Sequence, residues 1–136
     1  QINKAIDTYE RVVAMNPKDE KAKEKQVDRA AEALFVMGAI FESRADFDRA
    51  ASYFERLADD KYRDHERASD AIYNAGLLRE AMEQWDKAIE VYQKLIANDP
   101  DNEALTRRLT ELETLEPGSD RQTVPIESLA PDGTAG

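Results

Sequence analysis

The chain has 136 residues, enough for one ordinary domain and too few for a second core of useful size. Charged side chains make up 35% of the chain and hydrophobic ones 41%. We therefore expect thin layers of structure with a large solvent-exposed surface. No cysteine and a single histidine exclude disulfides, cysteine nucleophiles and metal centres built from several histidines. With 29 acidic and 19 basic residues, the net charge of -10 has the wrong sign for binding a nucleic-acid backbone.

Apolar residues at helical spacing run through most of the chain, beginning with a predicted helix over residues 4–15. That helix ends at Asn16, because the following Pro17 disfavours helical geometry in the residue before it. A second helix is predicted over 19–43, with Asp19 as its N-terminal cap.

Four further helices are predicted, separated by polar turns. Asp46 can cap the third, the fourth is marked by apolar residues over 68–78, and the fifth by those over 85–96. The sixth covers roughly 102–115, and the polar stretch 59–65 is predicted to be a frayed turn or an extended helix start. No alternating apolar and polar pattern of useful length indicates a strand, so the predicted fold class is all-α.

The last part of the chain differs in composition, since proline and glycine punctuate it and large apolar residues are few. We predict a disordered or loosely docked tail over 117–136. The composition favours a plain linker; the alternative is that Val124, Pro125 and Ile126 form an extended peptide that docks in a groove.

The helices are related by a repeated pattern of small and aromatic residues. Each copy has a glycine, an alanine twelve residues later and an aromatic residue four residues after that: Gly38, Ala50 and Phe54, then Gly76, Ala88 and Tyr92. Ala5 and Tyr9 share the last spacing. This pattern resembles the tetratricopeptide repeat, a helix–turn–helix unit of 34 residues.

The resemblance implies an α-solenoid of antiparallel helix pairs stacked as a right-handed superhelix. Residues 1–17 would be the second helix of a truncated repeat, and 18–66 a repeat with a lengthened first helix. Residues 67–102 would be the best-matching repeat, and 102–116 a C-terminal capping helix. Small residues at the glycine and alanine positions let the two helices of a unit cross closely, and the aromatic residues Tyr9, Phe54 and Tyr92 are expected to fill the gap between successive units.

Departures from the family spacing are informative. The equivalent alanines are 45 and then 38 residues apart instead of 34, and the excesses of 11 and 4 are close to whole turns at about 3.6 residues each. Whole turns lengthen a helix without rotating its buried face, which is why we predict the long helix over 19–43. Ala45 and Glu83 stand where the family often has glycine in the turn, and Tyr62 replaces a usual proline, so the connection 58–66 is expected to be irregular.

Residues that could carry chemistry are few, and we expect no catalytic, cofactor or metal site. His65 lies in a charged run, which favours a solvated surface side chain over a proton shuttle or metal ligand. The aspartate pairs at 59–60 and 99–101 lack the oxygen-rich loop of a calcium site, which favours helix capping. No glycine-rich loop for phosphate is present.

In the resembled family, the first helix of each unit lines a concave surface that holds a partner's peptide or helix. The positions carried over to this chain are Glu32, Phe35, Ala39 and Glu42 in one unit and Asp70, Tyr73, Asn74, Leu77 and Glu80 in the next. Asn74 matches a frequent asparagine that bonds a bound peptide's backbone. Acidic and aromatic residues together predict a basic or amphipathic segment as the partner. The alternative is that these residues merely face solvent or the sixth helix.

The function predicted is that of a non-catalytic adaptor or scaffold module that binds another protein in this groove. The alternative is a structural or oligomerising segment of a larger cell-envelope or scaffold protein, its groove empty or filled by its own tail. An open N-terminal face would then allow a homo-oligomer. We expect no nucleic-acid partner and no membrane insertion. The long, irregular units resemble bacterial cell-envelope repeat proteins, which favours the periplasm over the cytoplasm.

Overall fold

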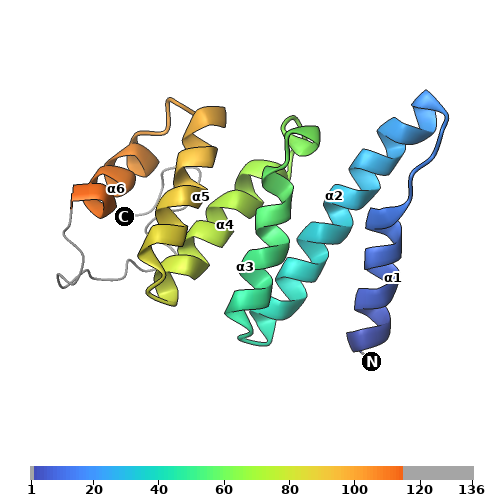
Figure 1. Ribbon diagram of the computed structural model, residues 1–136, viewed down its shortest axis with the longest axis horizontal. Helices are drawn as coiled ribbons and strands as arrows, with labels where there is room; N and C mark the ends of the chain where they lie inside the picture. Colours follow the sequence, from blue (N-terminus) through green and yellow to red (C-terminus); the bar gives the residue numbers. More distant parts are fainter. Residues whose placement is uncertain (1, 115–136) are drawn as a thin grey trace.

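The computed structural model describes residues 2–114 (Figure 1); the predicted tail over 117–136 lies outside them. The described residues form six α-helices, two short 3-10 helices and no strand: α1 (Ile2–Ala14), α2 (Glu20–Ser43), α3 (Phe47–Glu55), η1 (Arg56–Ala58), η2 (Asp60–Tyr62), α4 (Ala68–Ala81), α5 (Trp85–Asn98) and α6 (Glu103–Thr114). The predicted all-α class is confirmed, as is the long helix predicted over 19–43.

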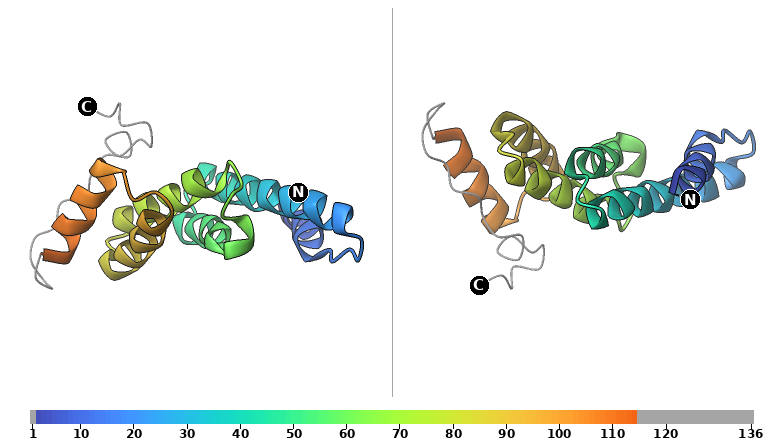
Figure 2. Two further views of the ribbon diagram at one scale, coloured as in Figure 1. Left: turned by 90° about the horizontal axis from the view of Figure 1, so that it is seen from above. Right: turned by 90° about the horizontal axis from the view of Figure 1, so that it is seen from below.

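Successive helices from α1 to α5 run in opposite directions and each packs against the next (Figure 1). Seen from above or below, α1, α3 and α5 lie on one side and α2 and α4 on the other (Figure 2). α6 follows at the far end, against α5. This is a stack of antiparallel helix pairs, as predicted; the handedness of its superhelix stays a prediction.

Side-chain caps fix where three of the helices begin. A carboxylate oxygen of Asp19 accepts a hydrogen bond from the backbone N–H of Ala22 at 3.1 Å, at the start of α2. Asp46 caps α3 in the same way, and the amide oxygen of Asn102 accepts from the N–H of Leu105 at 3.0 Å, at the start of α6. These bonds satisfy N–H groups that a helix leaves without a partner.

Glycine is required where the two helices of a unit cross. A Cβ at Gly38 would lie 2.5 Å from a ring carbon of Phe54, and one at Gly76 would lie 2.1 Å from a ring carbon of Tyr92. Both rings are buried, with 1% and 0% of their surface exposed. The predicted small residues at the helix crossings are therefore confirmed, but the rings of Phe54 and Tyr92 pack on the glycine of their own unit, where we predicted that they fill the gap between successive units.

In the turns within the two units, a residue other than glycine occupies a backbone position with a positive φ angle, which glycine adopts more easily. Ala45 and Glu83 have φ angles of 60° and 58°, in the left-handed region that side chains disfavour. They occupy the turns between α2 and α3 and between α4 and α5. Each therefore carries local backbone strain of about 1 kcal/mol or more.

The connection between α3 and α4 is irregular, as expected over 58–66, but over 59–65 it is neither the frayed turn nor the extended helix start that we predicted. It folds as η1 and η2, and the side chains of Leu57 and Tyr62 are buried. A carboxylate oxygen of Asp59 accepts from the N–H of Lys61 at 3.0 Å, which confirms the predicted capping role of that aspartate. Two apolar anchors in a polar stretch are enough to fold it onto the core.

A buried arginine ties α4 to α3. The side chain of Arg79 is only 5% exposed. Its guanidinium donates to both carboxylate oxygens of Glu55 at 2.9 and 2.7 Å, to Asp48 at 2.8 Å and to the amide oxygen of Gln84 at 2.8 Å. These bonds with Glu55 are the main reason that the pKa of Arg79 is raised. Such a bidentate pair fixes the relative position of neighbouring units.

Candidate partner-binding groove

The first unit presents its predicted groove residues at the surface of α2. They recur at helical spacing on one side of the helix, so they form a continuous strip. Ala39 is exposed, and Glu32, Phe35 and Glu42 are half-buried. Partial burial raises the pKa of Glu42 above its ordinary value. These four residues are therefore accessible to a partner.

The second unit exposes fewer of its predicted groove residues than we expected. Asp70 is exposed and Asn74 is half-buried, but Tyr73, Leu77 and Glu80 are 2%, 6% and 1% exposed. The prediction that these three lie on an accessible surface is wrong. We use the name α2–α4 face for the accessible remainder: Glu32, Phe35, Ala39, Glu42, Asp70 and Asn74.

The sixth helix explains the burial of Glu80. Arg108 of α6 donates from Nε to Glu80 Oε1 at 3.0 Å and binds the same oxygen through Nη2, while Tyr92 of α5 donates its hydroxyl to Glu80 Oε2 at 2.7 Å. Tyr73 and Leu77 belong to one apolar cluster with Leu105 of α6. The alternative of contact with the sixth helix is therefore correct for Glu80, whereas Tyr73 and Leu77 lie in the common core of the described helices.

The buried tyrosines of this cluster are in contact. The rings of Tyr73 and Tyr92 meet edge to face, with centroids 6.2 Å apart. Burial is the largest cause of the raised pKa of both phenols, and the charge of Glu80 adds to it. The hydroxyl of Tyr73 is buried and has no hydrogen-bond partner in the described part of the chain. It is an unsatisfied polar group, which costs stability.

Arg67 already covers part of the α2–α4 face. Its guanidinium lies 4.7 Å from the centre of the Phe35 ring, and its Nε lies 3.5 Å from Glu32 Oε1. Phe35 also contacts the buried ring of Phe54, at 5.5 Å between centroids. The face thus offers an aromatic surface beside carboxylates, an arrangement that attracts a cation.

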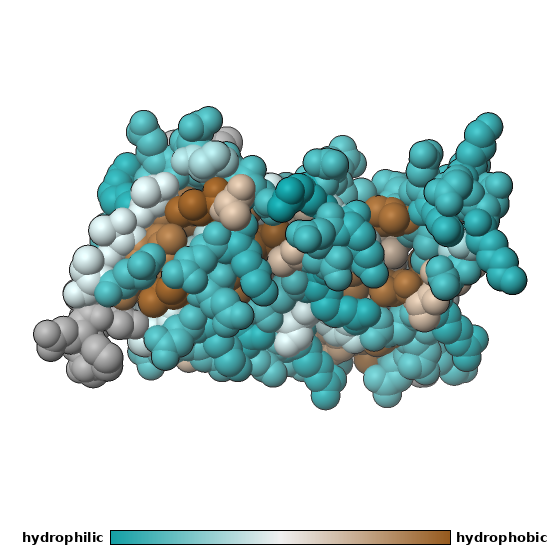
Figure 3. All heavy atoms as spheres, turned by 45° about the horizontal axis from the view of Figure 1, so that its top comes forward, coloured by the Kyte–Doolittle hydropathy of each residue, from teal (hydrophilic) through white to brown (hydrophobic). Residues whose placement is uncertain are grey.

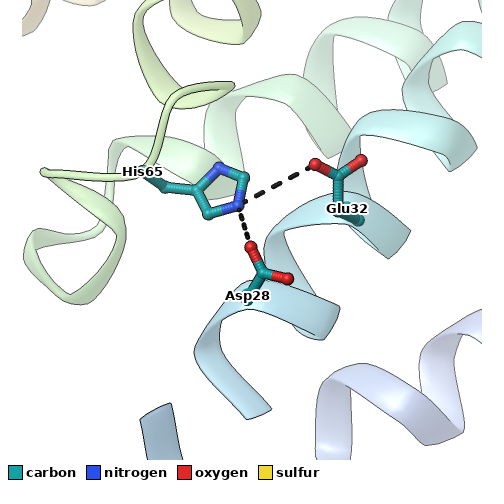
Figure 4. Close-up of side chains that lie close together, drawn as sticks. All are labelled: Asp28, Glu32 and His65. Carbon is teal, nitrogen blue, oxygen red and sulfur yellow. Dashed lines mark hydrogen bonds and ion pairs between the residues drawn. The ribbon is translucent and has the colours of Figure 1, made fainter. Parts of the chain in front are cut away.

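His65 is not a solvated surface residue, contrary to the prediction, since its side chain is 8% exposed. Its Nε2 lies 2.9 Å from Asp28 Oδ1 and 3.9 Å from Glu32 Oε1, both on α2 (Figure 4). Its Nδ1 accepts a hydrogen bond from the backbone N–H of Arg67 at 3.0 Å. The imidazole therefore ties α2 to the residues just before α4.

The same three side chains, Asp28, Glu32 and His65, have ligand atoms within 4.8 Å of one another, which raises the question of a metal site. The hydrogen bonds answer it. Since Nδ1 accepts from Arg67, a neutral imidazole carries its proton on Nε2 and donates it to Asp28. A metal ion on Nε2 would displace this proton and leave the neutral ring protonated at Nδ1, which would then face the N–H donor of Arg67. We assign the cluster a structural role.

The described helices include none that is long and apolar enough to cross a membrane.

Comparison with known proteins gives the family. A tetratricopeptide repeat model matches residues 33–68 and a second one matches residues 70–102. No curated protein and no solved structure matches the chain. The two matched segments cover just over half of the chain and coincide with the stacked helix pairs and their glycine–aromatic crossings. The chain belongs to the tetratricopeptide repeat family.

Proposed function

We propose that this chain is a non-catalytic interaction module whose α2–α4 face binds a segment of another protein. Repeats of this family generally mediate protein–protein interaction. The observation that carries the proposal is the face itself, where accessible apolar and acidic side chains lie together on the first helices of two neighbouring units. The second unit contributes only Asp70 and Asn74, so most of the binding surface lies on α2.

The chemistry of the α2–α4 face favours a basic or amphipathic partner. Glu32, Glu42 and Asp70 supply negative charge, and Phe35 supplies an aromatic surface. Arg67 is an internal example of the ligand that this surface selects, because its guanidinium stacks on Phe35 beside Glu32. An incoming lysine or arginine would meet the remaining carboxylates of the face, Glu42 and Asp70, or would displace Arg67 from Phe35. Charges of opposite sign speed and orient the encounter.

A peptide that alternates lysine with leucine tests this proposal, with its glutamate counterpart as the comparison. Binding is measured by isothermal titration calorimetry at two salt concentrations. The variant Ala39→Arg with Glu42→Lys places positive charge on the face without removing a buried side chain. Its matched control, Ala97→Arg with Glu113→Lys, makes the same charge change at exposed positions of α5 and α6.

The proposal predicts that the lysine peptide binds the wild-type chain and that the face variant weakens this binding about tenfold, since charges at the rim of an interface contribute modestly each. The control should change the affinity by less than about twofold. Equal loss in both variants would show attraction to the net charge of -10 alone and would contradict a specific site.

A second candidate function, self-association, is favoured by one observation on α1. This helix carries Ile2, Ile6, Tyr9 and Val13 against the core, yet none of its residues is fully buried. In the described residues α1 packs mainly on α2 and pairs through Glu10 with Arg56 of η1, and the apolar area left exposed on α1 could be covered by a second copy. Light scattering across a range of concentrations tests it, and a strict monomer would remove it. A place within a bacterial cell-envelope assembly belongs to this alternative.

A further inference from the structure

Three hollows are lined entirely by residues outside the α2–α4 face. The first, of about 320 Å³, lies between α3, α4 and α5, and the second, of about 350 Å³, lies among α1, η1 and η2. The third, of about 220 Å³, lies under the turn between α1 and α2. The first two share Ala58, and the second and third share Val13 and Tyr62, so the hollows are adjacent.

These hollows, which we call the basic trough, reverse the charge balance of the chain. Of the described residues that line them, six are basic and three acidic, whereas the whole chain has 19 basic and 29 acidic residues. The basic ones are Lys23, Arg56, Lys61, Arg79, Lys87 and Lys94. Three of them already pair with carboxylates: Arg79 with Glu55, Arg56 with Glu10 and Lys23 with Glu20. The excess positive charge of the trough therefore comes from Lys61, Lys87 and Lys94.

Several of these cations are free to meet a ligand. Lys87 makes no ion pair in the described part of the chain, and Lys94 lies 4.0 Å from Glu90, at the limit of an ion pair, with both side chains more than half exposed. Lys61 lies over the ring of Tyr62 and pairs with no carboxylate among the described residues. Arg79, in contrast, is fully engaged with Glu55 and serves as part of the wall.

The floor of the trough is apolar. It includes Ile72, Val91, Leu34, Val13 and Ala58, of which Val13 and Ala58 remain partly accessible. Figure 3 shows hydrophobic side chains at the bottom of gaps between hydrophilic ones on the face turned forward. The exposed Met15 stands at one end. A ligand here would need apolar groups pointing down and negative groups pointing to the rim.

We propose that the basic trough is a second binding surface, which takes an extended acidic segment of a partner protein. In an extended segment, successive side chains point to opposite sides, so acidic and apolar residues in alternation would meet rim and floor together. The favoured partner thus has the opposite charge to the one that the α2–α4 face attracts. A row of adjacent hollows along two units suits a linear ligand more than a small molecule.

The experiment uses the full chain and a fluorescent peptide that alternates glutamate with valine, read by fluorescence anisotropy at low and physiological salt. The test variant, Lys87→Glu with Lys94→Glu, changes two exposed side chains on the rim. The matched control, Lys21→Glu with Lys25→Glu, makes the same charge change on α2 outside the trough. Circular dichroism confirms that both variants stay helical.

We expect the acidic peptide to bind the wild-type chain, the rim variant to weaken that binding about tenfold and the control to change it by less than about twofold. A lysine–valine peptide should be indifferent to the rim substitutions. The inference is overturned if the acidic peptide fails to bind, or if both variants weaken it equally. The test of the α2–α4 face uses a different peptide and different variants. A negative result there would leave the expected results for the basic trough unchanged, so each proposal can be refuted independently of the other.

Discussion

Replacing Gly76 with alanine sets two effects of opposite sign against each other. In the interior of a helix, alanine is favoured over glycine by about 1 kcal/mol. The added Cβ, however, would lie 2.1 Å from a ring carbon of Tyr92, well inside any allowed contact. The ring is completely buried, and its hydroxyl is held by a 2.7 Å hydrogen bond to Glu80, so it cannot turn away freely.

Overpacking of a core costs about 1–3 kcal/mol, and the tethered ring puts this site at the upper end of that range. After the gain in helix propensity, we expect Gly76→Ala to lower the free energy of unfolding by about 1–2 kcal/mol. Urea denaturation followed by circular dichroism measures this change, provided that the slope of the transition is the same in both chains.

A double-mutant cycle with Tyr92→Leu isolates the contact. With the ring removed, alanine at position 76 should be neutral or stabilising, because only its propensity remains. The reasoning would be refuted if Gly76→Ala were as stable as the wild type, or if it destabilised the Tyr92→Leu chain by the same amount. The second outcome would place the cost elsewhere in the backbone.

Three further outcomes follow from the structure. Glu83→Gly should stabilise the chain by about 1 kcal/mol in urea denaturation, because its φ of 58° suits glycine; an equal or lower midpoint would argue against strain there. Glu80→Ala should destabilise it by about 3 kcal/mol, since Arg108 loses its buried partner, and calorimetry should show it; a loss below 1 kcal/mol would mean that α6 contributes little. The free energy of unfolding should fall as the pH rises above about 10. Burial raises the pKa of Tyr92 in the folded chain, so the unfolded chain loses the phenol proton at lower pH than the folded one. A flat stability profile at alkaline pH would contradict this.

The features that could be predicted from the sequence are those set by neighbours along the chain. The long helix over 19–43 followed from whole-turn spacing, and its cap followed from Asp19. The close crossings followed from small residues at a fixed distance from aromatic ones, at Gly38 and Gly76. Local periodicity and steric fit act within one helix pair, so a linear pattern records them directly.

The features that the sequence did not reveal depend on pairs far apart along the chain. Glu80 is buried because Arg108, 28 positions later, docks on it. Helical spacing alone puts Arg108 on the polar side of its helix, and its burial requires knowing where α6 lies. His65 likewise depends on Asp28, 37 positions earlier. Polar residues carry no signal of burial unless their partners are known.

The helix α4 links the elements on both of its sides, because two consecutive residues of α4 bind different helices. Arg79 binds Glu55 of α3, and Glu80 binds Arg108 of α6. Since consecutive helical residues point about 100° apart, one helix can fix the units on both sides of it. Arg79 thereby shapes the wall of the basic trough, and Glu80 closes one end of the α2–α4 face. The two proposed surfaces thus share one scaffold while keeping opposite charge, so a partner of either sign can be selected without competing for the same residues.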